Sequence, residues 1–123
     1  MLYSVPDLKR INDVPHSADY GRWRGELDRI DQGAFAIIHG ELDARFQNRE
    51  VDTSSWIPGA DWRNTPFQPI YEACRQDPIS AALFFGLVVW QVVMDRDDCW
   101  SFGRYEKGGV PIRGMTYFRI DCP

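Results

Sequence analysis

The residues with the clearest potential for chemistry are His39 and Glu41, which are separated by one glycine. A His-x-Glu pair occurs in zinc-dependent nucleobase deaminases, where a Pro-Cys-x-x-Cys segment completes the metal site. In this chain Cys74, Cys99 and Cys122 are scattered, and none of them follows a proline. We therefore predict no metal site, and we expect His39 to be a helix histidine with one ring nitrogen hydrogen-bonded.

Other catalytic patterns are also missing from the chain. A di-metal carboxylate bundle needs Glu-x-x-His at helical spacing, and neither histidine has a glutamate three residues before it. There is no Gly-x-Ser-x-Gly segment, and the Gly108-Gly109 pair has no helix signal after it. A pairing of a cysteine with His16 or His39 is left open, but we predict no cofactor and favour binding over catalysis.

The strongest compositional signal is the combination of aromatic residues and arginine. The chain has five Trp, five Tyr and seven Phe, and arginine adjoins them in Arg22-Trp23-Arg24, Trp62-Arg63, Arg104-Tyr105 and Phe118-Arg119. Trp, Tyr and Arg dominate binding hot spots, and guanidinium groups stack on aromatic rings. The alternative is that the aromatics build the core while the arginines form surface pairs with aspartates, each worth about 0–1 kcal/mol.

The binding interpretation predicts a pocket between a loop and a hairpin. Loop side chains would cover one hairpin face, and the arginines would favour an anionic or planar ligand. The candidate ligand-binding residues are Trp56, Trp62, Arg63, Trp100, Arg104, Tyr117 and Arg119.

The central element is the apolar segment from Ile79 to Met94. It is shorter than the roughly 20 residues of a membrane span, Gln91 interrupts it, and acidic residues flank it at Asp77 and Asp95–Asp98. The Asp77-Pro78 pair is a cap followed by proline, which is typical of a helix start. We therefore predict a buried helix.

The preceding segments also show helical patterns. Residues 18–47 carry apolar residues at steps of three and four, with Ser17 as the expected cap. Gly21, Gly25, Gly33 and Gly40 mark either a break near Gly33 or close packing of another helix, so one helix and two helices both stay open. Residues 48–64 are typical of a long loop, and Thr65 to Gln68 predicts the start of a short helix.

The C-terminal region predicts a β-hairpin. Residues 100–106 and 111–121 are rich in β-formers and flank a turn around Gly108-Gly109. A turn there pairs Gly103 with Gly114 and Trp100 with Tyr117. The two glycines would leave a notch in one face, where we expect the 79–94 helix to pack. Residues 2–5 could add a short edge strand.

The fold class that follows is α+β in one domain, residues 1–123. A long amphipathic helix, a short helix and the buried apolar helix pack on a C-terminal hairpin or small sheet. The net charge of −4 argues against nucleic acid as a partner. An odd number of cysteines and an N-terminus without an apolar export signal indicate a cytoplasmic protein with free thiols.

These patterns specify no reaction, ligand or biological process. Our leading hypothesis is a small cytoplasmic, non-enzymatic binding or interaction protein that forms a homodimer, because a small domain has little material to cover a helix that is apolar all round. The size and lack of motifs fit an accessory protein of a mobile element. The alternatives are a small-molecule-binding protein or small enzyme with an aromatic and arginine-lined pocket, and an inhibitor or immunity-type protein. We expect no membrane partner.

Overall fold

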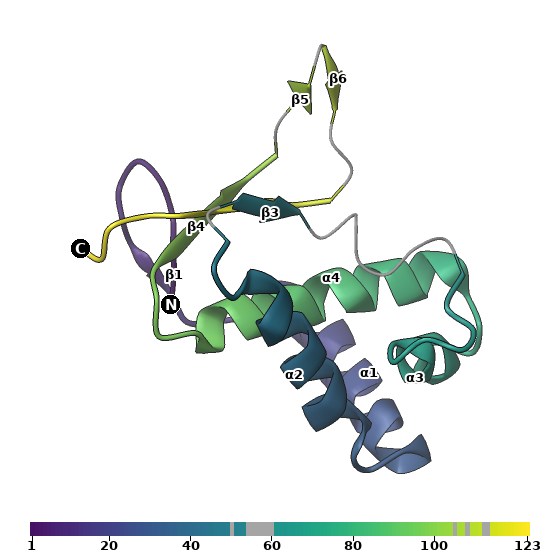
Figure 1. Cartoon of the computed structure of the whole chain (residues 1–123). Helices are drawn as coiled ribbons and strands as arrows, with labels where there is room; N and C mark the ends of the chain where they lie inside the picture. Colours follow the sequence, from purple (N-terminus) through teal and green to yellow (C-terminus); the bar gives the residue numbers. More distant parts are fainter. Residues whose placement is uncertain (50, 54–60, 105, 108, 112–113) are drawn as a thin grey trace.

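The computed structural model of the chain describes residues 1–49, 51–53, 61–104, 106–107, 109–111 and 114–123. It is an α+β fold in which the helices pack on one side of a small sheet (Figure 1). The fold class predicted from sequence is therefore confirmed.

The N-terminal helical region is divided into two helices. Helix α1 spans Ser17–Ile30 and helix α2 spans Ala34–Phe46, with Asp31 in an extended conformation between them. The break falls near Gly33 as one of our two alternatives expected. The other explanation, that the glycines allow another helix to pack closely, is wrong. A Cβ atom at Gly21, Gly25, Gly33 or Gly40 would meet nothing within 4 Å.

Capping of the helices differs in part from the sequence prediction. Ser17 is the first residue of α1 rather than its cap, and the preceding His16 has a positive φ of 52°. The helix expected from Thr65 begins three residues later, as α3, Gln68–Ala73. The Thr65 hydroxyl is used in a turn instead, since it accepts a bond from the Phe67 amide at 3.2 Å and donates one to the Trp62 carbonyl at 2.8 Å.

The apolar segment forms helix α4, Pro78–Asp95, as predicted. Asp77 caps it, because one carboxylate oxygen accepts from the Ile79 amide at 3.1 Å and the other from the Ser80 hydroxyl at 2.8 Å. Only residues 74–77 separate α3 from α4, and Figure 1 shows α3 lying across the N-terminal end of α4. This short connection makes the pair a helix-turn-helix arrangement.

The main sheet combines short strands from both ends of the chain. Its order is β2-β1-β4-β7-β3; β1 pairs with β4 in parallel, and the other neighbours are antiparallel. The expected N-terminal edge strand lies inside the sheet, because β2 covers its outer side. Strand β3 falls in the segment expected to be loop. The strands are β1, Leu2–Tyr3; β2, Arg10–Ile11; β3, Val51–Thr53; β4, Trp100–Gly103; and β7, Thr116–Arg119.

The register of the hairpin agrees with the prediction only at its tip. There β5, Glu106–Lys107, pairs with β6, Val110–Pro111, around the expected turn. Below the tip, Gly103 pairs with Thr116 rather than with Gly114, and Trp100 pairs with Arg119 rather than with Tyr117. The returning segment contains two more residues than the outgoing one, and Gly114 lies there with a φ of 76°. The predicted notch of opposed glycines is therefore wrong.

Helix α4 packs on the sheet face opposite to the one that we expected. The Trp90 ring lies 4.6 Å from the Phe102 ring and 6.5 Å from the Tyr117 ring, measured between centroids. On α2, the Phe46 ring meets the Trp100 ring edge-on at 5.3 Å. The observed pairing differs from the predicted one by two residues, and side chains along a strand alternate between the two faces. Each hairpin side chain is therefore on the face predicted for it, and only the face predicted to contact α4 is wrong. Helix α4 packs on the aromatic face of the hairpin because that face offers more apolar area to bury.

Helix α4 is the centre of the core. By length and composition it could cross a membrane, with a mean hydropathy of 1.6. Its buried residues contact the other helices and the sheet; for example, the Phe84 ring packs against Tyr20 and Trp23 of α1. The buried residues of α4 are Ala81, Phe84, Phe85, Leu87, Val88, Val89, Trp90, Val92 and Val93.

The prediction of free thiols is wrong for two of the three cysteines. Cys99 and Cys122 form a disulfide, whereas Cys74 is free and buried. The pairing follows from the register, since the Ile120 amide donates to the Cys99 carbonyl at 2.9 Å and Cys122 lies two residues further on. The two Cα atoms are 5.2 Å apart, which is within the usual range for a disulfide.

Candidate functional site

The sequence-predicted ligand residues lie in three separate places. Trp62 is buried against α3 and α4, where its ring stacks on Tyr71 at 6.3 Å. The neighbouring Arg63 forms an ion pair with Asp61 at 2.9 Å in solvent. Loop residue Trp62 therefore does not cover the hairpin. Trp56 lies outside the described residues.

Trp100 and Arg119 lie together at the opposite end of the main sheet from the tip hairpin. Trp100 is fully buried, and its indole nitrogen donates to Asp98 at 2.7 Å. The Arg119 guanidinium bonds to the same carboxylate and lies 5.6 Å from the Trp100 ring centroid. Because these polar groups bond to one another, this pair is part of the framework of the fold.

Arg104 and Tyr117 line a groove of about 750 Å³ beside α4. We call it the α4 groove. Helix α4 forms one wall, the hairpin forms the other, and the residues before α1 close one end. Its described lining consists of Pro15, His16, Pro78, Ile79, Ala82, Leu83, Gly86, Leu87, Trp90, Arg104, Gly114, Met115 and Tyr117.

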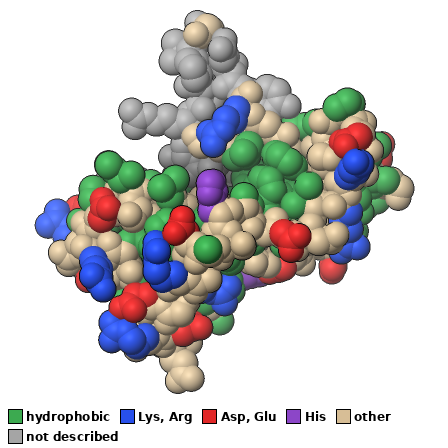
Figure 2. Space-filling model, turned by 180° about the vertical axis from the view of Figure 1, so that it is seen from behind, with side chains coloured by type: hydrophobic (Ala, Val, Ile, Leu, Met, Phe, Trp, Pro, Cys, Tyr) green, Lys and Arg blue, Asp and Glu red, His purple; other side chains and the backbone are tan. Residues whose placement is uncertain are grey.

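The helical wall of the α4 groove is apolar and partly open to solvent. Ile79 and Leu83, one turn apart, are 74% and 58% exposed and together form an apolar patch on this wall. Ala82 and Gly86 beside them have small side chains or none, so they leave space in the groove. In Figure 2, which shows the molecule from behind, hydrophobic side chains lie on both sides of a histidine, with a basic side chain above it.

The sheet wall supplies the polar groups of the groove. Tyr117 is only 1% exposed, and its hydroxyl forms no hydrogen bond with any residue that the structure describes. Burial raises the pKa of Tyr117, while the positive charge of Arg104 acts in the opposite direction. The phenol is therefore protonated at neutral pH and can donate a hydrogen bond into the groove.

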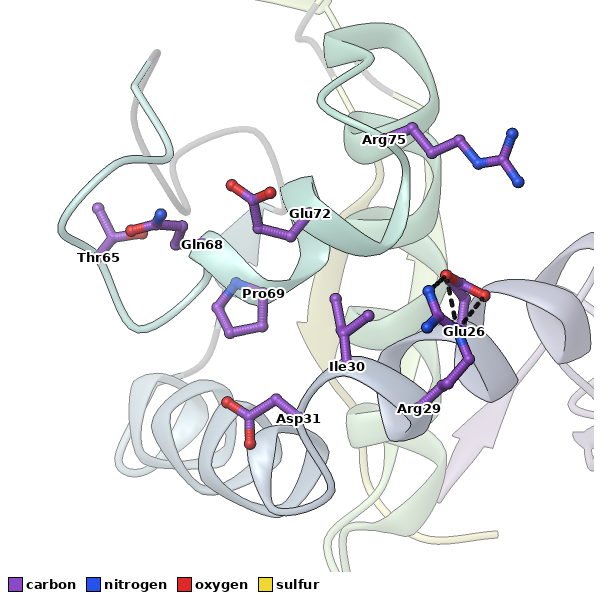
Figure 3. Close-up of a pocket in the computed structure, with 9 residues that line it drawn as sticks. All are labelled: Glu26, Arg29, Ile30, Asp31, Thr65, Gln68, Pro69, Glu72 and Arg75. Carbon is purple, nitrogen blue, oxygen red and sulfur yellow. Dashed lines mark hydrogen bonds and ion pairs between the residues drawn. The ribbon is translucent and has the colours of Figure 1, made fainter.

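A second hollow of about 620 Å³ lies between the end of α1 and α3 (Figure 3). Its lining is mostly charged, and Arg29 pairs there with Glu26. Asp31, which follows α1, and Glu72 of α3 do not join that pair in Figure 3. The described residues contain no group of three or more His, Cys, Asp or Glu that could hold a metal. The described residues of this hollow therefore form no cluster that resembles a catalytic or metal site.

His39 behaves as predicted, with one ring nitrogen bonded. Its Nε2 atom lies 2.9 Å from a carboxylate oxygen of Asp95, at the end of α4. The other oxygen of Asp95 accepts from the Gln91 side-chain amide at 2.9 Å, and the Oε1 atom of Gln91 accepts from the Tyr20 hydroxyl at 3.5 Å. These bonds connect three helices, and within the described part of the chain they include no nucleophile beside the histidine.

The exposed wall of α4 is the part of the site that sequence reasoning missed. Ile79 and Leu83 belong to the run that we expected to be buried on every side. The available signal was the helical spacing itself, because Ile79, Ala82, Leu83 and Gly86 share one face of a helix.

No family model matches the chain, and no curated protein or solved structure was found to be similar to it.

Proposed function

We propose that this chain is a non-enzymatic binding protein whose binding surface is the α4 groove. The observation that carries the proposal is the exposure of Ile79 and Leu83 at the edge of a hollow of about 750 Å³. Ligand sites in proteins are typically hollows of about 300–1,000 Å³ with apolar walls and a few polar groups. The α4 groove has this size and this composition.

The same surface supports our expectation that nucleic acid is not the partner. In DNA-binding helix-turn-helix proteins the second helix reads base edges, and basic side chains contact the phosphates. Helix α4 occupies that second position, yet it contains no Lys, Arg or His. An apolar wall suits an apolar ligand or partner.

A second copy of the chain is the other candidate occupant, in agreement with the homodimer hypothesis. Ile79 and Leu83 favour it, because two such faces would bury each other's apolar side chains about a two-fold axis. Membership of a mobile element, an inhibitory role and a cytoplasmic location stay proposals. The Cys99–Cys122 disulfide removes the thiol argument for the cytoplasm.

The test uses a neutral fluorescent probe of apolar surface, Nile red, with Leu83→Lys as the disrupting variant. The matched control is Ile37→Lys, since Ile37 is an equally apolar residue of α2, is 62% exposed and does not line the groove. We expect the wild-type chain and Ile37→Lys to bind the probe equally and Leu83→Lys to bind at least tenfold more weakly. Equal binding by both variants would contradict the proposal.

Light scattering on the same three proteins separates the two candidate occupants. A dimer that dissociates only in Leu83→Lys would identify the second copy as the occupant. A monomer in all three, with probe binding lost only in Leu83→Lys, would support a small ligand.

A further inference from the structure

The polar groups of the α4 groove indicate which chemical class of ligand it takes, provided that the proposed binding function is correct. We propose that the groove binds a small amphiphilic carboxylate, with its carboxylate at Arg104 and Tyr117 and its hydrocarbon body along Ile79, Leu83 and Trp90.

Tyr117 provides the first argument. Tyr117 is 1% exposed and lines the groove, but its hydroxyl has no partner among the residues described. Because a protonated phenol donates, an acceptor on a ligand would satisfy it, and a carboxylate oxygen is the strongest common acceptor.

Arg104 provides the second argument. It is exposed, and within the described ranges it forms no ion pair, whereas Arg29, Arg63, Arg96 and Arg119 all pair with acidic side chains. Arg104 is two residues beyond Phe102, which is opposite Tyr117 in the sheet. The two side chains line the same groove, and the positive charge of Arg104 acts on the Tyr117 phenol. Both groups can then reach one carboxylate.

The charge of the groove also favours an anionic ligand. The chain has a net charge of −4, but none of the groove's described lining residues is acidic. Arg104 and His16 are the basic residues of that lining. An anionic group therefore meets an attractive local charge on a protein that is acidic overall.

The apolar part of the groove extends away from this polar end. Trp90 packs beside Tyr117, and Ile79 lies eleven residues earlier on α4. At 1.5 Å per residue this separation is about 16 Å along the helix axis. A hydrocarbon body of similar or shorter length fits between the polar end and Ile79. Decanoate is a suitable probe.

The experiment measures the affinity of the full chain for three ten-carbon probes below their micelle concentrations: decanoate, 1-decanol and decyltrimethylammonium. Calorimetry gives the dissociation constants, and the rise in melting temperature gives an independent readout. We expect decanoate to bind at least tenfold more tightly than decanol, and the ammonium probe to bind most weakly.

Two conservative variants test the assigned groups. Arg104→Gln and Tyr117→Phe should each weaken decanoate binding by about tenfold, because each removes a charge-assisted hydrogen bond, and should weaken decanol binding much less, because a neutral hydroxyl forms weaker hydrogen bonds. Arg63→Gln is the matched control, since Arg63 is an exposed arginine outside the groove. Tyr117→Phe should fold normally, because its hydroxyl has no partner in the described part of the chain.

Each contrary outcome identifies what is wrong. Equal binding of decanoate and decanol would overturn the carboxylate assignment but leave the binding function intact. Binding to decanoate-containing vesicles and never to free decanoate would overturn the assignment of a free ligand. A dimer that excludes all three probes would assign the groove to a second copy, and absence of both probe and Nile red binding would overturn the binding function itself.

Discussion

Arg96 binds Asp98 through two parallel hydrogen bonds, from Nε to Oδ1 at 2.9 Å and from Nη2 to Oδ2 at 3.0 Å. The Arg96 side chain is only 7% exposed, and it also donates to Asp43 of α2 at 2.7 Å. Asp98 in turn accepts bonds from Trp100 and Arg119 of the sheet. This cluster therefore connects α2, the end of α4 and the sheet, close to the Cys99–Cys122 disulfide.

Stability should depend on the ionisation of Asp98. Burial acts to raise its pKa, but the bonds from Arg96, Arg119 and Trp100 outweigh burial and hold the pKa well below its usual value of 3.8. A carboxylate with a lowered folded-state pKa stabilises the fold above its unfolded pKa, and this contribution is lost as the pH falls from about 5 toward the folded value. Urea unfolding should therefore show a falling midpoint over this range.

Replacing Asp98 by Asn should remove part of that pH dependence. We expect Asp98→Asn to lower the unfolding free energy by about 2 kcal/mol at pH 7, because hydrogen bonds to charged groups are lost, and to flatten the curve below pH 5. Asp61→Asn is the control, since the Asp61–Arg63 pair lies in solvent and should contribute little. Parallel curves for wild type and Asp98→Asn would contradict the assignment.

Two glycines in helices should be replaceable by alanine with a gain in stability. Gly25 of α1 and Gly86 of α4 lie within helices, and a Cβ atom at either would meet nothing within 4 Å. Each substitution should therefore raise the unfolding free energy by about 1 kcal/mol, measured by urea unfolding. Only Gly86 lines the α4 groove, so only Gly86→Ala should change Nile red affinity. A loss of stability in Gly25→Ala would show that its surroundings are not open.

Much of the fold could be predicted because its signals are local. The Asp77-Pro78 cap and the uninterrupted apolar run specify where α4 begins and that it is buried, and neither depends on distant residues. The break at Gly33 is similarly local. The register below the hairpin tip is not, because it depends on how two extra residues are accommodated around Gly114.

The candidate site was harder to predict for a related reason. Arg104 and Tyr117 could be named from their types, but the exposure of Ile79 and Leu83 depends on which side of α4 the sheet covers. Which side is covered depends in turn on which of the two hairpin faces packs against the helix. The disulfide likewise depends on the strand register, since the predicted pairing puts Cys99 opposite Phe118 rather than near Cys122.

The cysteines should give a distinctive alkylation pattern. Burial raises the pKa of the Cys74 thiol to about 11, so very little reactive thiolate is present at neutral pH. With iodoacetamide and no reductant we expect no adduct on the folded protein and one adduct after denaturation in guanidinium chloride. Denaturation with reductant should give three. Mass spectrometry counts the adducts, and three adducts without reductant would contradict the disulfide.

Phe46 should be among the most sensitive core positions, because it joins α2 to the sheet. It is fully buried, and its ring meets the rings of Trp100 at 5.3 Å and Tyr117 at 5.8 Å edge-on. Phe46→Ala removes both contacts and leaves a cavity, which should cost about 3–5 kcal/mol. Ile37→Ala, at an exposed position of the same helix, should cost less than about 0.5 kcal/mol. Calorimetric unfolding checks both values, and a similar melting temperature for the two variants would show that α2 does not depend on this aromatic contact.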